Sequence, residues 1–428
     1  MELLAPAGNL EKLRYAYLYG ADAVYIGLHG FSLRTRADNF GDEDYAELRR
    51  IKASRRLYCA LNVYLFDEDI YRLEQTLDQV EEGLFDAFIV SDPGIVQLLR
   101  RRFPKTELHL STQANCTNAE AARVYRDMGF ARIVPARELS LKQIAAIKQA
   151  VPEMEIEAFV HGAMCLAYSG RCFLSQWMSD RSGNRGDCAH SCRWAYRPGV
   201  DPLVLEEEKR PGEFYPLIEG EGFTELLSSR DICMIDHLGA MRDAGVDSLK
   251  IEGRMKSVYY TALVTRAYRK ALDALAPRVQ PSSGAAQSSV PPVPADPVAQ
   301  AELAGFTAEL EQVSHRDYST GFYFGRDDID RPAERGYRRT FLFLGTIEEQ
   351  VSDRRYRIAV KNAFSTGQTV QYLGPHSAAL EDSRFRLLDP ELQPVEQVIH
   401  HGDWLLETDC PVEPGFLIRT RLSPERRA

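Results

Sequence analysis

Short apolar runs alternate with amphipathic segments over roughly the first 275 residues of the chain. The apolar runs carry Val, Ile, Leu and Phe at both odd and even positions, which is typical of parallel strands buried on both faces. We expect eight such strands, at Glu2–Ala5, Ala23–Leu28, Leu57–Tyr64, Asp86–Ser91, Glu107–Thr112, Arg132–Ala136, Glu155–His161 and Ser248–Glu252.

The segments that join a predicted helix to the strand after it resemble one another. Gly20-Ala-Asp-Ala-Val-Tyr-Ile and Gly245-Val-Asp-Ser-Leu-Lys-Ile each place a glycine before an apolar run, with looser copies at Gly83 and Gly129. A glycine at this point can adopt the left-handed conformation that ends a helix. Helix starts are also marked by capping residues. The candidates are Asn9, Asp92 before Pro93, Thr117 or Asn118, Ser140 and Ser229.

Eight strands alternating with helices predict an α/β fold, a (β/α)8 TIM-like barrel over residues 1–276. The alternative is a doubly wound open sheet. We favour the barrel because no glycine-rich dinucleotide loop follows the first strand. A long segment, residues 162–225, interrupts the alternation of strands and helices before the last strand. We expect it to be a Cys-rich insertion.

The second half of the chain has a different pattern. Residues 277–300 are rich in Pro, Ser and Ala and predict a flexible linker, and residues 301–337 are expected to be an extension that closes the catalytic domain. Residues 338–428 switch to period-two runs with Gly and Pro turns, which predict a small C-terminal antiparallel β-barrel-like domain. Its expected strands are Phe341–Ile347, Tyr356–Val360, Thr369–Leu373, Phe385–Leu388, Trp404–Glu407 and Phe416–Arg421.

Charge and composition narrow the kinds of partner and the cellular location that we expect for the protein. The net charge is −10, which argues against wholesale wrapping of nucleic acid but not against a local basic patch. No run of 18 apolar residues occurs, so we expect no membrane span. The N-terminus lacks a basic region followed by an apolar one, so we expect a cytoplasmic protein whose cysteines are reduced thiols.

Four of the eight cysteines fall within 28 positions, and three kinds of role fit them. Buried, inert thiols are one possibility, although such residues have no reason to gather in a Gly- and Ser-rich loop. Zinc sites usually show close C-x2-4-C pairs, whereas iron–sulfur clusters tolerate irregular spacing. The candidate ligands are Cys165, Cys172, Cys188 and Cys192, with Cys233 as a possible replacement or else a core thiol on a helix over Asp231–Ala244.

The segment around these cysteines resembles a known family, the collagenase-like peptidases (family 32 of the peptidases of unassigned mechanism). The signature is Glu157-Ala-Phe-Val-His161-Gly-Ala-Met-Cys165 followed by Tyr168-Ser-Gly-Arg-Cys172-Phe-Leu-Ser175. Further similar motifs are Leu4-Ala-Pro-Ala-Gly8, Phe31-Ser-Leu-Arg34 with Asn39-Phe40, Val90-Ser-Asp-Pro-Gly94, Ser111-Thr-Gln113 with Asn115, Ala136-Arg-Glu-Leu-Ser140, Lys250-Ile-Glu-Gly-Arg254-Met-Lys-Ser257 and Thr320-Gly-Phe-Tyr-Phe-Gly325.

The resemblance implies an oxygen-independent hydroxylase that carries a [4Fe-4S] cluster. The Cys188-Ala-His-Ser-Cys192 run and the C-terminal domain are similar to a branch that forms 5-hydroxyuridine at the wobble position of tRNA, with prephenate as the hydroxyl source. The partners expected are therefore tRNA and a small carboxylate donor, and a homologous partner subunit is a further possibility. Other branches act on ribosomal RNA or on ubiquinone precursors.

A peptidase is the alternative activity that the family name suggests. Peptidases need an activated nucleophile or a metal-bound water. The chain has neither His-Glu-x-x-His nor Gly-x-Ser-x-Gly, although a dyad of Cys165 and His161 is conceivable.

The expected site lies at the carboxyl ends of the predicted strands, where barrel enzymes place their chemistry. His161, Glu252 and Glu138 are the candidate proton-transfer groups. Arg254 and Lys256 are expected to hold the two carboxylates of a prephenate-like donor, since a guanidinium pairs well with a carboxylate. Further candidates for substrate binding are Arg137, Gln113, Asn115 and Asn62.

Local basic spots support RNA binding modestly, because Arg beside aromatic residues suits single-stranded loops. We expect the small C-terminal domain to dock the tRNA. The spots are Arg100–Arg102, Arg338–Arg339, Arg354–Arg357, Arg419 and Arg421, and solvated surface charge is the simpler explanation for each.

Overall fold

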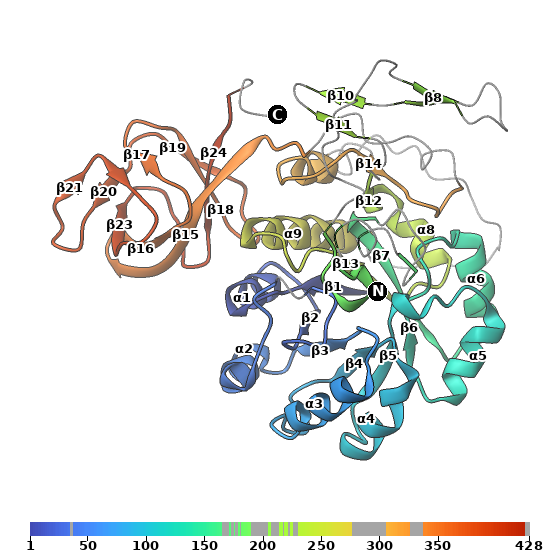
Figure 1. Cartoon of the computed structure of the whole chain (residues 1–428). Coiled ribbons are helices and arrows are strands. Elements are labelled where there is room, and N and C mark those ends of the chain that lie inside the picture. Colours follow the sequence, from blue (N-terminus) through green and yellow to red (C-terminus); the bar gives the residue numbers. More distant parts are fainter. Residues whose placement is uncertain are drawn as a thin grey trace, which may run out of the picture.

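The computed structural model describes residues 1–34, 37–164, 171–172, 175, 179, 181–189, 230–275, 305–325 and 337–423, and the backbone of short strands within 204–225. The expected linker 277–300 and the cysteines Cys165 and Cys192 lie outside these residues. The described residues form a large barrel and a smaller β domain that lies beside it (Figure 1).

The barrel is closed, as the sequence predicts, and the open-sheet alternative is wrong. Its last strand pairs in parallel with both the first strand and the seventh, which completes the ring seen in Figure 1. In ring order the strands are β1 (Glu2–Pro6), β2 (Ala23–Gly27), β3 (Arg56–Leu61), β4 (Ala87–Val90), β5 (Glu107–Leu110), β6 (Arg132–Ile133), β7 (Glu155–Ala163) and β13 (Ser248–Ile251).

Helices cover the outside of the ring (Figure 1). Four of the expected caps are confirmed, because Asn9, Asn118 and Ser140 accept hydrogen bonds from the first turn of the helix that each precedes, and Asp92 does the same for the short 3-10 helix Pro93–Ile95 that leads into α4. Gly20 and Gly245 have φ of 105° and 81°, the left-handed conformation expected after a helix. Among the described residues, the helices around the ring are α1 (Leu10–Leu18), α2 (Tyr45–Lys52), α3 (Asp67–Leu77), α4 (Val96–Arg102), α5 (Ala119–Asp127), α6 (Leu141–Ala150), α8 (Leu238–Asp243) and α9 (Val258–Leu275).

Charged side chains fill the interior near the amino ends of the strands. Arg132 lies 2.7 Å from Glu2 and 3.1 Å from Glu157, and Glu157 in turn lies 2.6 Å from Lys250. Burial of Glu2 would raise its pKa, but the Arg132 guanidinium outweighs this effect and lowers the pKa to about 2. This network joins β1, β6, β7 and β13 from within.

Two short strands extend the barrel sheet beyond β7, and they correct one sequence-based expectation. Cys233 does not lie on a helix: Asp231–Cys233 forms β12, which pairs antiparallel with the end of β7. β14 (Tyr318–Ser319) then pairs with β12. The strand is held by a buried ion pair between Asp231 and Arg316, with 2.7 Å between Oδ1 and Nη2. The helix α8 begins only at Leu238.

The C-terminal domain is a curled antiparallel sheet with its own apolar core. All six expected strands are present within it, and β19 and β21 form its two ends. In sheet order the strands are β19 (Leu380–Asp382), β18 (Val370–Leu373), β24 (Leu417–Arg421), β15 (Phe341–Ser352), β16 (Arg355–Val360), β23 (Trp404–Glu407), β20 (Arg386–Leu388) and β21 (Pro394–Val395). A separate two-stranded antiparallel sheet is formed by β17 (Phe364–Ser365) and β22 (Gln397–Val398).

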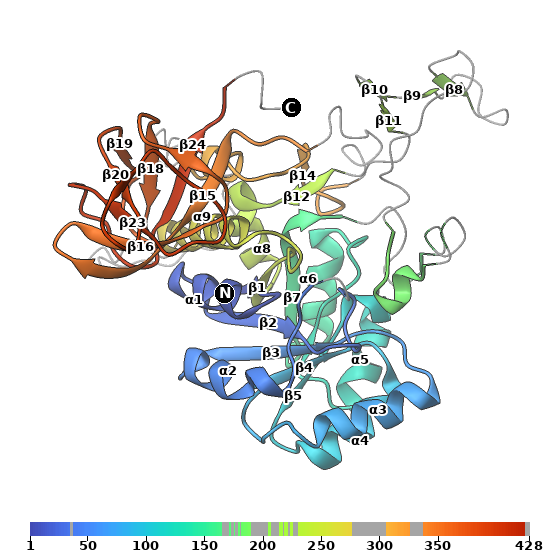
Figure 2. The same ribbon diagram turned by 60° about the vertical axis from the view of Figure 1, so that its left-hand side comes forward.

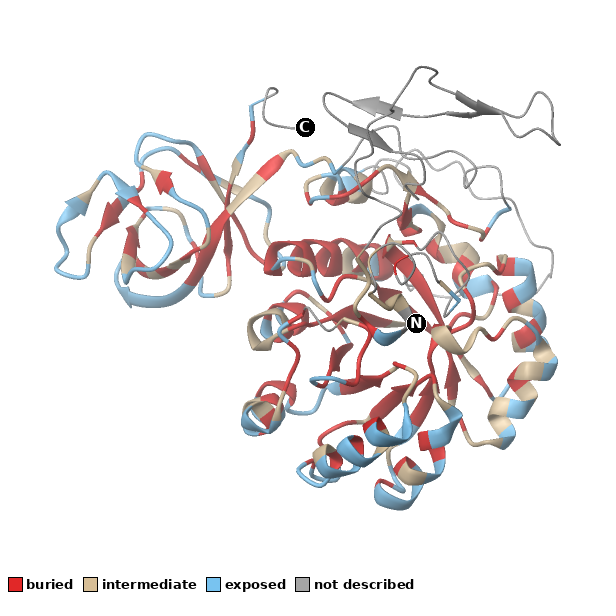
Figure 3. Cartoon of the chain, viewed as in Figure 1, coloured by how far each residue is buried: buried red, intermediate tan, exposed pale blue. Residues whose placement is uncertain are grey.

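This domain packs against α1 and α9 of the barrel (Figure 2). The Tyr19 hydroxyl donates to the Leu373 carbonyl at 2.7 Å, and buried Arg419 donates to the Tyr259 hydroxyl at 3.1 Å. Phe341 and Leu417 belong to the same apolar cluster as the barrel helices. Consequently α9 is buried along most of its length (Figure 3).

None of the helices in the described part of the chain has the length and apolar character needed to cross a membrane.

Candidate active site at the barrel mouth

The carboxyl ends of the barrel strands, called the barrel mouth below, hold a cluster of charged groups. Glu252 leaves β13, and its Oε1 accepts from Arg34 Nε and Nη2 at 3.2 and 3.0 Å. Arg137 Nη2 lies 3.8 Å from the other carboxylate oxygen. Burial alone would raise the pKa of Glu252, but the charges of Arg34, Arg137 and Arg254 outweigh it, so the pKa lies below its usual range and the carboxylate is ionised.

Arg254 is the most enclosed cation of this cluster, with only 3% of the residue exposed. Its Nη1 donates to Ser32 Oγ at 3.0 Å and Asn39 Oδ1 at 3.3 Å. It makes no ion pair within 4 Å to any carboxylate of the described residues. Burial lowers its pKa to about 10, so the guanidinium is still charged at neutral pH. A buried cation without a paired anion is costly, which favours an anionic ligand here.

Two glycines make room for this arginine. A Cβ atom at Gly27 would lie 1.8 Å from Arg254 Nη1, and one at Gly8 would lie 2.4 Å from the Arg254 carbonyl oxygen. Such approaches are shorter than any real contact, so a side chain at either position forces Arg254 to move.

Arg137 is also enclosed and only partly bonded. Its guanidinium carbon lies 3.9 Å from the centre of the Phe159 ring, and its Nε is buried with no hydrogen-bond partner in the described residues. The ring and the nearby Glu252 hold the guanidinium in place. The side chain thus keeps hydrogen-bonding capacity to offer to a ligand.

The structure separates Lys256 from Arg254, although the sequence predicts that they act together. Lys256 Nζ lies 3.5 Å from the Ser314 carbonyl oxygen and 4.3 Å from the centre of the Tyr337 ring. Those contacts place it beside the extension that carries β14, whereas Arg254 faces the loop after β2.

The remaining polar candidates lie on the rim and mostly support the backbone. Asn62 Oδ1 accepts from the Leu33 amide at 3.0 Å, which ties β3 to the loop that carries Arg34. The Gln113 carbonyl accepts from the Tyr64 hydroxyl at 2.7 Å. Asn115 has a φ of 56°, and its buried Oδ1 lacks a hydrogen-bond partner among the described residues. Glu138 is half-buried in the turn between β6 and α6.

His161 lies away from the barrel interior, although Glu157 and Phe159 of the same strand face inward. The pairing of β7 with β13 shifts register between Lys250 and Ile251, and this irregularity turns His161 outward. Its ring packs within 5.9 Å of the rings of Tyr260, Tyr268 and Tyr318. Burial lowers its pKa to about 3, so the ring is neutral at physiological pH.

Three of the five candidate cysteine ligands lie in the described residues. Cys172 and Cys188 are half-buried, and Cys233 ends β12 opposite His161. Burial raises the pKa of the Cys233 thiol to about 11, so a positively charged centre would be needed to hold it as a thiolate. The described residues alone do not bring three metal-binding side chains together. Thiols remain the donor type that iron–sulfur clusters require.

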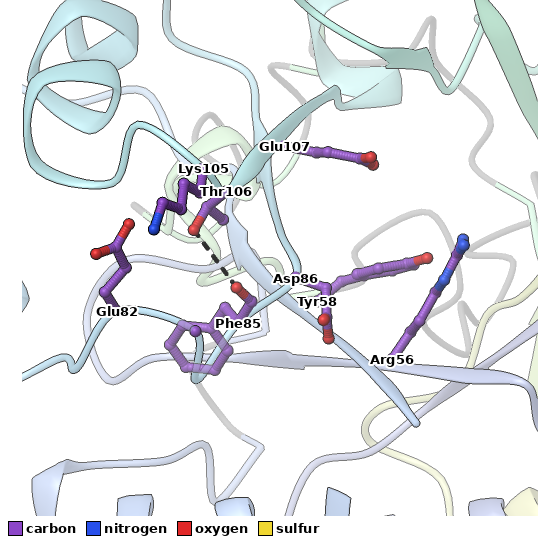
Figure 4. A pocket seen from close by; sticks show the side chains of 9 residues that line it. Arg56, Tyr58, Glu82, Phe85, Asp86, Lys105, Thr106 and Glu107 are labelled. Atoms are coloured by element: carbon purple, nitrogen blue, oxygen red, sulfur yellow. Dashed lines mark hydrogen bonds between the residues drawn. The ribbon is translucent and has the colours of Figure 1, made fainter. Parts of the chain in front are cut away.

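A cavity of about 520 Å3 lies at the amino ends of the barrel strands, opposite the mouth, and Figure 4 shows the side chains that line it. None of the candidate site residues lines it. Barrel enzymes place their chemistry at the carboxyl ends of the strands, so this cavity is not the expected active site. Its lining comes from the amino ends of β3, β4 and β5, as Arg56, Tyr58, Glu82, Gly83, Phe85, Asp86, Lys105, Thr106 and Glu107.

Sequence reasoning missed Arg34, Ser32 and Asn39 as members of the site. A sequence signal for these residues exists, because all three belong to the motif after the second strand that carries part of the family resemblance. Neither the spacing nor the composition of that loop indicates that it folds onto β13.

A closed (β/α)8 barrel with buried charges at the carboxyl ends of its strands defines a protein of the TIM-barrel class. Residues 8–332 match the family model described as "Peptidase family U32". The chain belongs to peptidase family U32.

Its relatives carry different names. It is 35% identical over 412 residues to "tRNA hydroxylation protein P" of Escherichia coli, an alignment that covers 87% of this chain and 86% of the relative. It is 41% identical over 278 residues to "23S rRNA 5-hydroxycytidine C2501 synthase" of the same organism, covering 64% and 40%. It is 34% identical over 286 residues to "Collagenase" of Porphyromonas gingivalis, covering 64% and 66%.

Proposed function

We propose that this protein is an RNA hydroxylase that forms 5-hydroxyuridine at the wobble position of tRNA, independently of oxygen and with prephenate as the hydroxyl source. Relatives named for tRNA and rRNA hydroxylation support the general activity. The observation that carries the proposal is the buried Arg254, which has no carboxylate partner among the described residues and lies beside the Arg34–Glu252–Arg137 cluster. Such a site favours a small acidic co-substrate over a peptide bond.

In this proposal the arginines bind and orient the donor. Arg254 and Arg137 offer guanidinium donors that suit carboxylate oxygens, and both sit on or beside barrel strands that hold them rigidly. Glu252 keeps Arg34 and Arg137 in place, and its carboxylate is ionised. Buried Tyr25 donates its hydroxyl to the Ile251 carbonyl at 3.0 Å, and the centre of its ring lies 4.4 Å from Lys250 Nζ in the barrel interior.

A [4Fe-4S] cluster, held by four of Cys165, Cys172, Cys188, Cys192 and Cys233, is the proposed cofactor, and it would supply electron transfer when bound. Protein purified without oxygen should be brown and carry about four iron and four sulfide per chain. Cys172→Ser should remove most of the colour, whereas Cys410→Ser, in the C-terminal domain, should not. A colourless, iron-free wild type would contradict the cofactor.

The substrate is tested by mass spectrometry of tRNA from a strain that lacks the gene. We expect 5-hydroxyuridine and its derivatives to disappear, to return with the wild-type gene, and to stay below one tenth of that level with Arg254→Ala. Normal wobble modification in the deletion strain would contradict the tRNA assignment. Loss of a hydroxylated ribosomal base would redirect it to rRNA.

The peptidase alternative finds less support at this site. The base of a Cys165–His161 dyad would be a ring enclosed by three tyrosines, with a pKa of about 3. Such a weak base activates a thiol poorly at neutral pH. We expect the purified protein to leave gelatin intact, and cleavage that is abolished by Cys165→Ser would overturn this view.

A further inference from the structure

Residues 181–189, called the cysteine loop below, form a compact unit around Cys188. Arg181 Nη2 lies 2.8 Å from Asp187 Oδ1 and donates to the Cys188 carbonyl at 3.2 Å. The hydroxyl of Ser175 donates to the Arg181 carbonyl at 2.6 Å and accepts from the Ala189 amide at 2.8 Å. These bonds fix the backbone on both sides of the cysteine.

Arg185 connects the cysteine loop to the barrel helices. Arg185 Nη2 lies 3.0 Å from Asp69 Oδ2, and its guanidinium carbon lies 4.4 Å from the centre of the Phe66 ring. Asp69 is almost fully buried at the start of α3, where it also accepts from the Phe66 amide at 3.0 Å. The arginine therefore meets a rigid, pre-formed acceptor instead of a mobile surface carboxylate.

This contact joins two parts of the chain that lie on opposite sides of the barrel mouth. The chain leaves the barrel at the end of β7, whereas Phe66 and Asp69 follow β3. In the ring order β13-β1-β2-β3-β4-β5-β6-β7, these two strands are four apart and so lie on opposite sides of the mouth. The loop that carries Cys188 is thus fastened to the rim opposite the strand from which its segment departs.

We propose that Arg185 is a positioning residue that latches the cysteine loop to α3 and so fixes Cys188 at the barrel mouth. The latch combines an ion pair with a buried carboxylate and a cation–π contact, and neither depends on a bound metal. The further claim that the latch helps to hold a metal centre rests on the proposed function, in which Cys188 is a candidate ligand. The latch itself stands on the contacts of Arg185 with Asp69 and Phe66.

Hydrogen–deuterium exchange of the full-length protein, followed by mass spectrometry of peptides within 181–189, tests the latch directly. We expect Arg185→Ala to raise exchange in the cysteine loop about tenfold, on the usual strength of one ion pair plus one cation–π contact. Arg185→Lys, which keeps the charge but loses the planar fork, should give an intermediate value.

Arg72→Ala is the matched control, because Arg72 pairs with the same Asp69 but lies on α3 itself. It should leave exchange in the cysteine loop unchanged. Equal exchange in Arg185→Ala and the wild type would overturn the latch, and so would equal increases in Arg185→Ala and Arg72→Ala, which would implicate α3 alone. If Arg185→Ala fails to fold, Phe66→Leu tests the same contact from the helix side, with a smaller expected increase.

A second readout links the latch to the metal centre. In anaerobically purified protein, iron should be lost to a chelator about tenfold faster from Arg185→Ala than from Arg72→Ala. If the protein proves to hold no iron, the proposed cofactor fails but the exchange experiment still decides the latch. Faster exchange with an unchanged rate of iron loss would show that Cys188 is not held for metal binding, and would overturn the positioning role.

Discussion

Arg254 shows how single residues set the chemistry of the barrel mouth. It is buried, remains charged and relies on the hydroxyl of Ser32 and the amide oxygen of Asn39 for hydrogen bonds. Neutral partners of this kind orient a guanidinium without cancelling its charge. The absence of a side chain at Gly27 is what permits this orientation.

Gly27→Ala should therefore behave like a substitution of Arg254 itself. The added methyl group would overlap Arg254 Nη1, so we expect 5-hydroxyuridine in cellular tRNA to fall at least tenfold. Gly305→Ala is the control, because a Cβ there meets no atom within 4 Å. Wild-type modification levels in a stably folded Gly27→Ala protein would argue against a binding role for Arg254.

The sequence predicted where this site lies better than it predicted which residues form it. Glu252, Arg254 and Arg137 could be placed at strand ends from the chain pattern alone, and in the structure the charges of both arginines act on Glu252, with Arg137 3.8 Å from its carboxylate. Lys256 does not join them, because it follows a turn after β13 that places it beside Ser314 and Tyr337. His161 does not join them either, because the register shift between β7 and β13 turns its side chain outward. That irregularity follows from pairing between distant strands and leaves no mark in local sequence.

At the scale of elements, the eight barrel strands and their helix caps were predictable because each has a local signature. The strand β12 was not, and its sequence was expected to be helical. Asp231 is drawn into the sheet by Arg316, which lies 85 positions further along the chain. A buried ion pair between such distant segments overrides local helical preference, and no single-sequence pattern reveals it.

Breaking this pair should loosen the extension that carries β14. Arg316→Ala leaves Asp231 buried without its cation, so we expect the free energy of unfolding in urea to fall by about 3–5 kcal/mol. Arg357→Ala, which removes an exposed pair with Glu349, should change it by less than about 1 kcal/mol. Similar losses in the two variants would mean that the Asp231–Arg316 pair does not hold β12.

The ion network inside the barrel should make stability depend on acid pH. The pKa of Glu2 is about 2 in the folded protein and near 4.5 when unfolded, so its contribution is complete above pH 4.5 and is lost as the pH falls toward 2. Glu2→Gln should lower stability at pH 6 by about 2–3 kcal/mol and flatten the profile between pH 4.5 and 2.

The control for this titration is Glu74→Gln, on the exposed side of α3. It should leave the urea midpoint and its dependence on pH close to those of the wild type. A Glu2→Gln profile that runs parallel to the wild-type profile would exclude Glu2 as a source of the acid sensitivity.

At the scale of the whole molecule, the C-terminal domain is part of the barrel's packing. The sequence favours this domain as the tRNA-docking unit, and a deletion would be the simplest test. The deletion would also expose the apolar surface that Phe341, Leu373 and Leu417 share with α1 and α9. A loss of tRNA binding after deletion would then have two explanations, so surface substitutions are the better experiment.

Arg339 and Arg421 are suitable positions because both are exposed near the junction with the barrel. Arg355 and Arg386 are less suitable, since Glu407 already pairs with both. The double variant Arg339→Glu/Arg421→Glu should bind tRNA at least fivefold more weakly and reduce the salt dependence of binding by about two phosphate contacts. Arg386→Glu should have little effect. Unchanged affinity of the double variant would remove this face from the docking surface.

The shared packing also bears on how the protein is made. Ring closure requires β13 to reach β1, so the barrel stays incomplete until residue 251 has emerged from the ribosome. The outer surface of α1, formed from residues 10–18, waits far longer for its cover, because that cover is built from residues beyond 340. Protein synthesis adds about 5–20 residues per second, so this surface stays exposed for many seconds, a period in which chaperones would have reason to bind it.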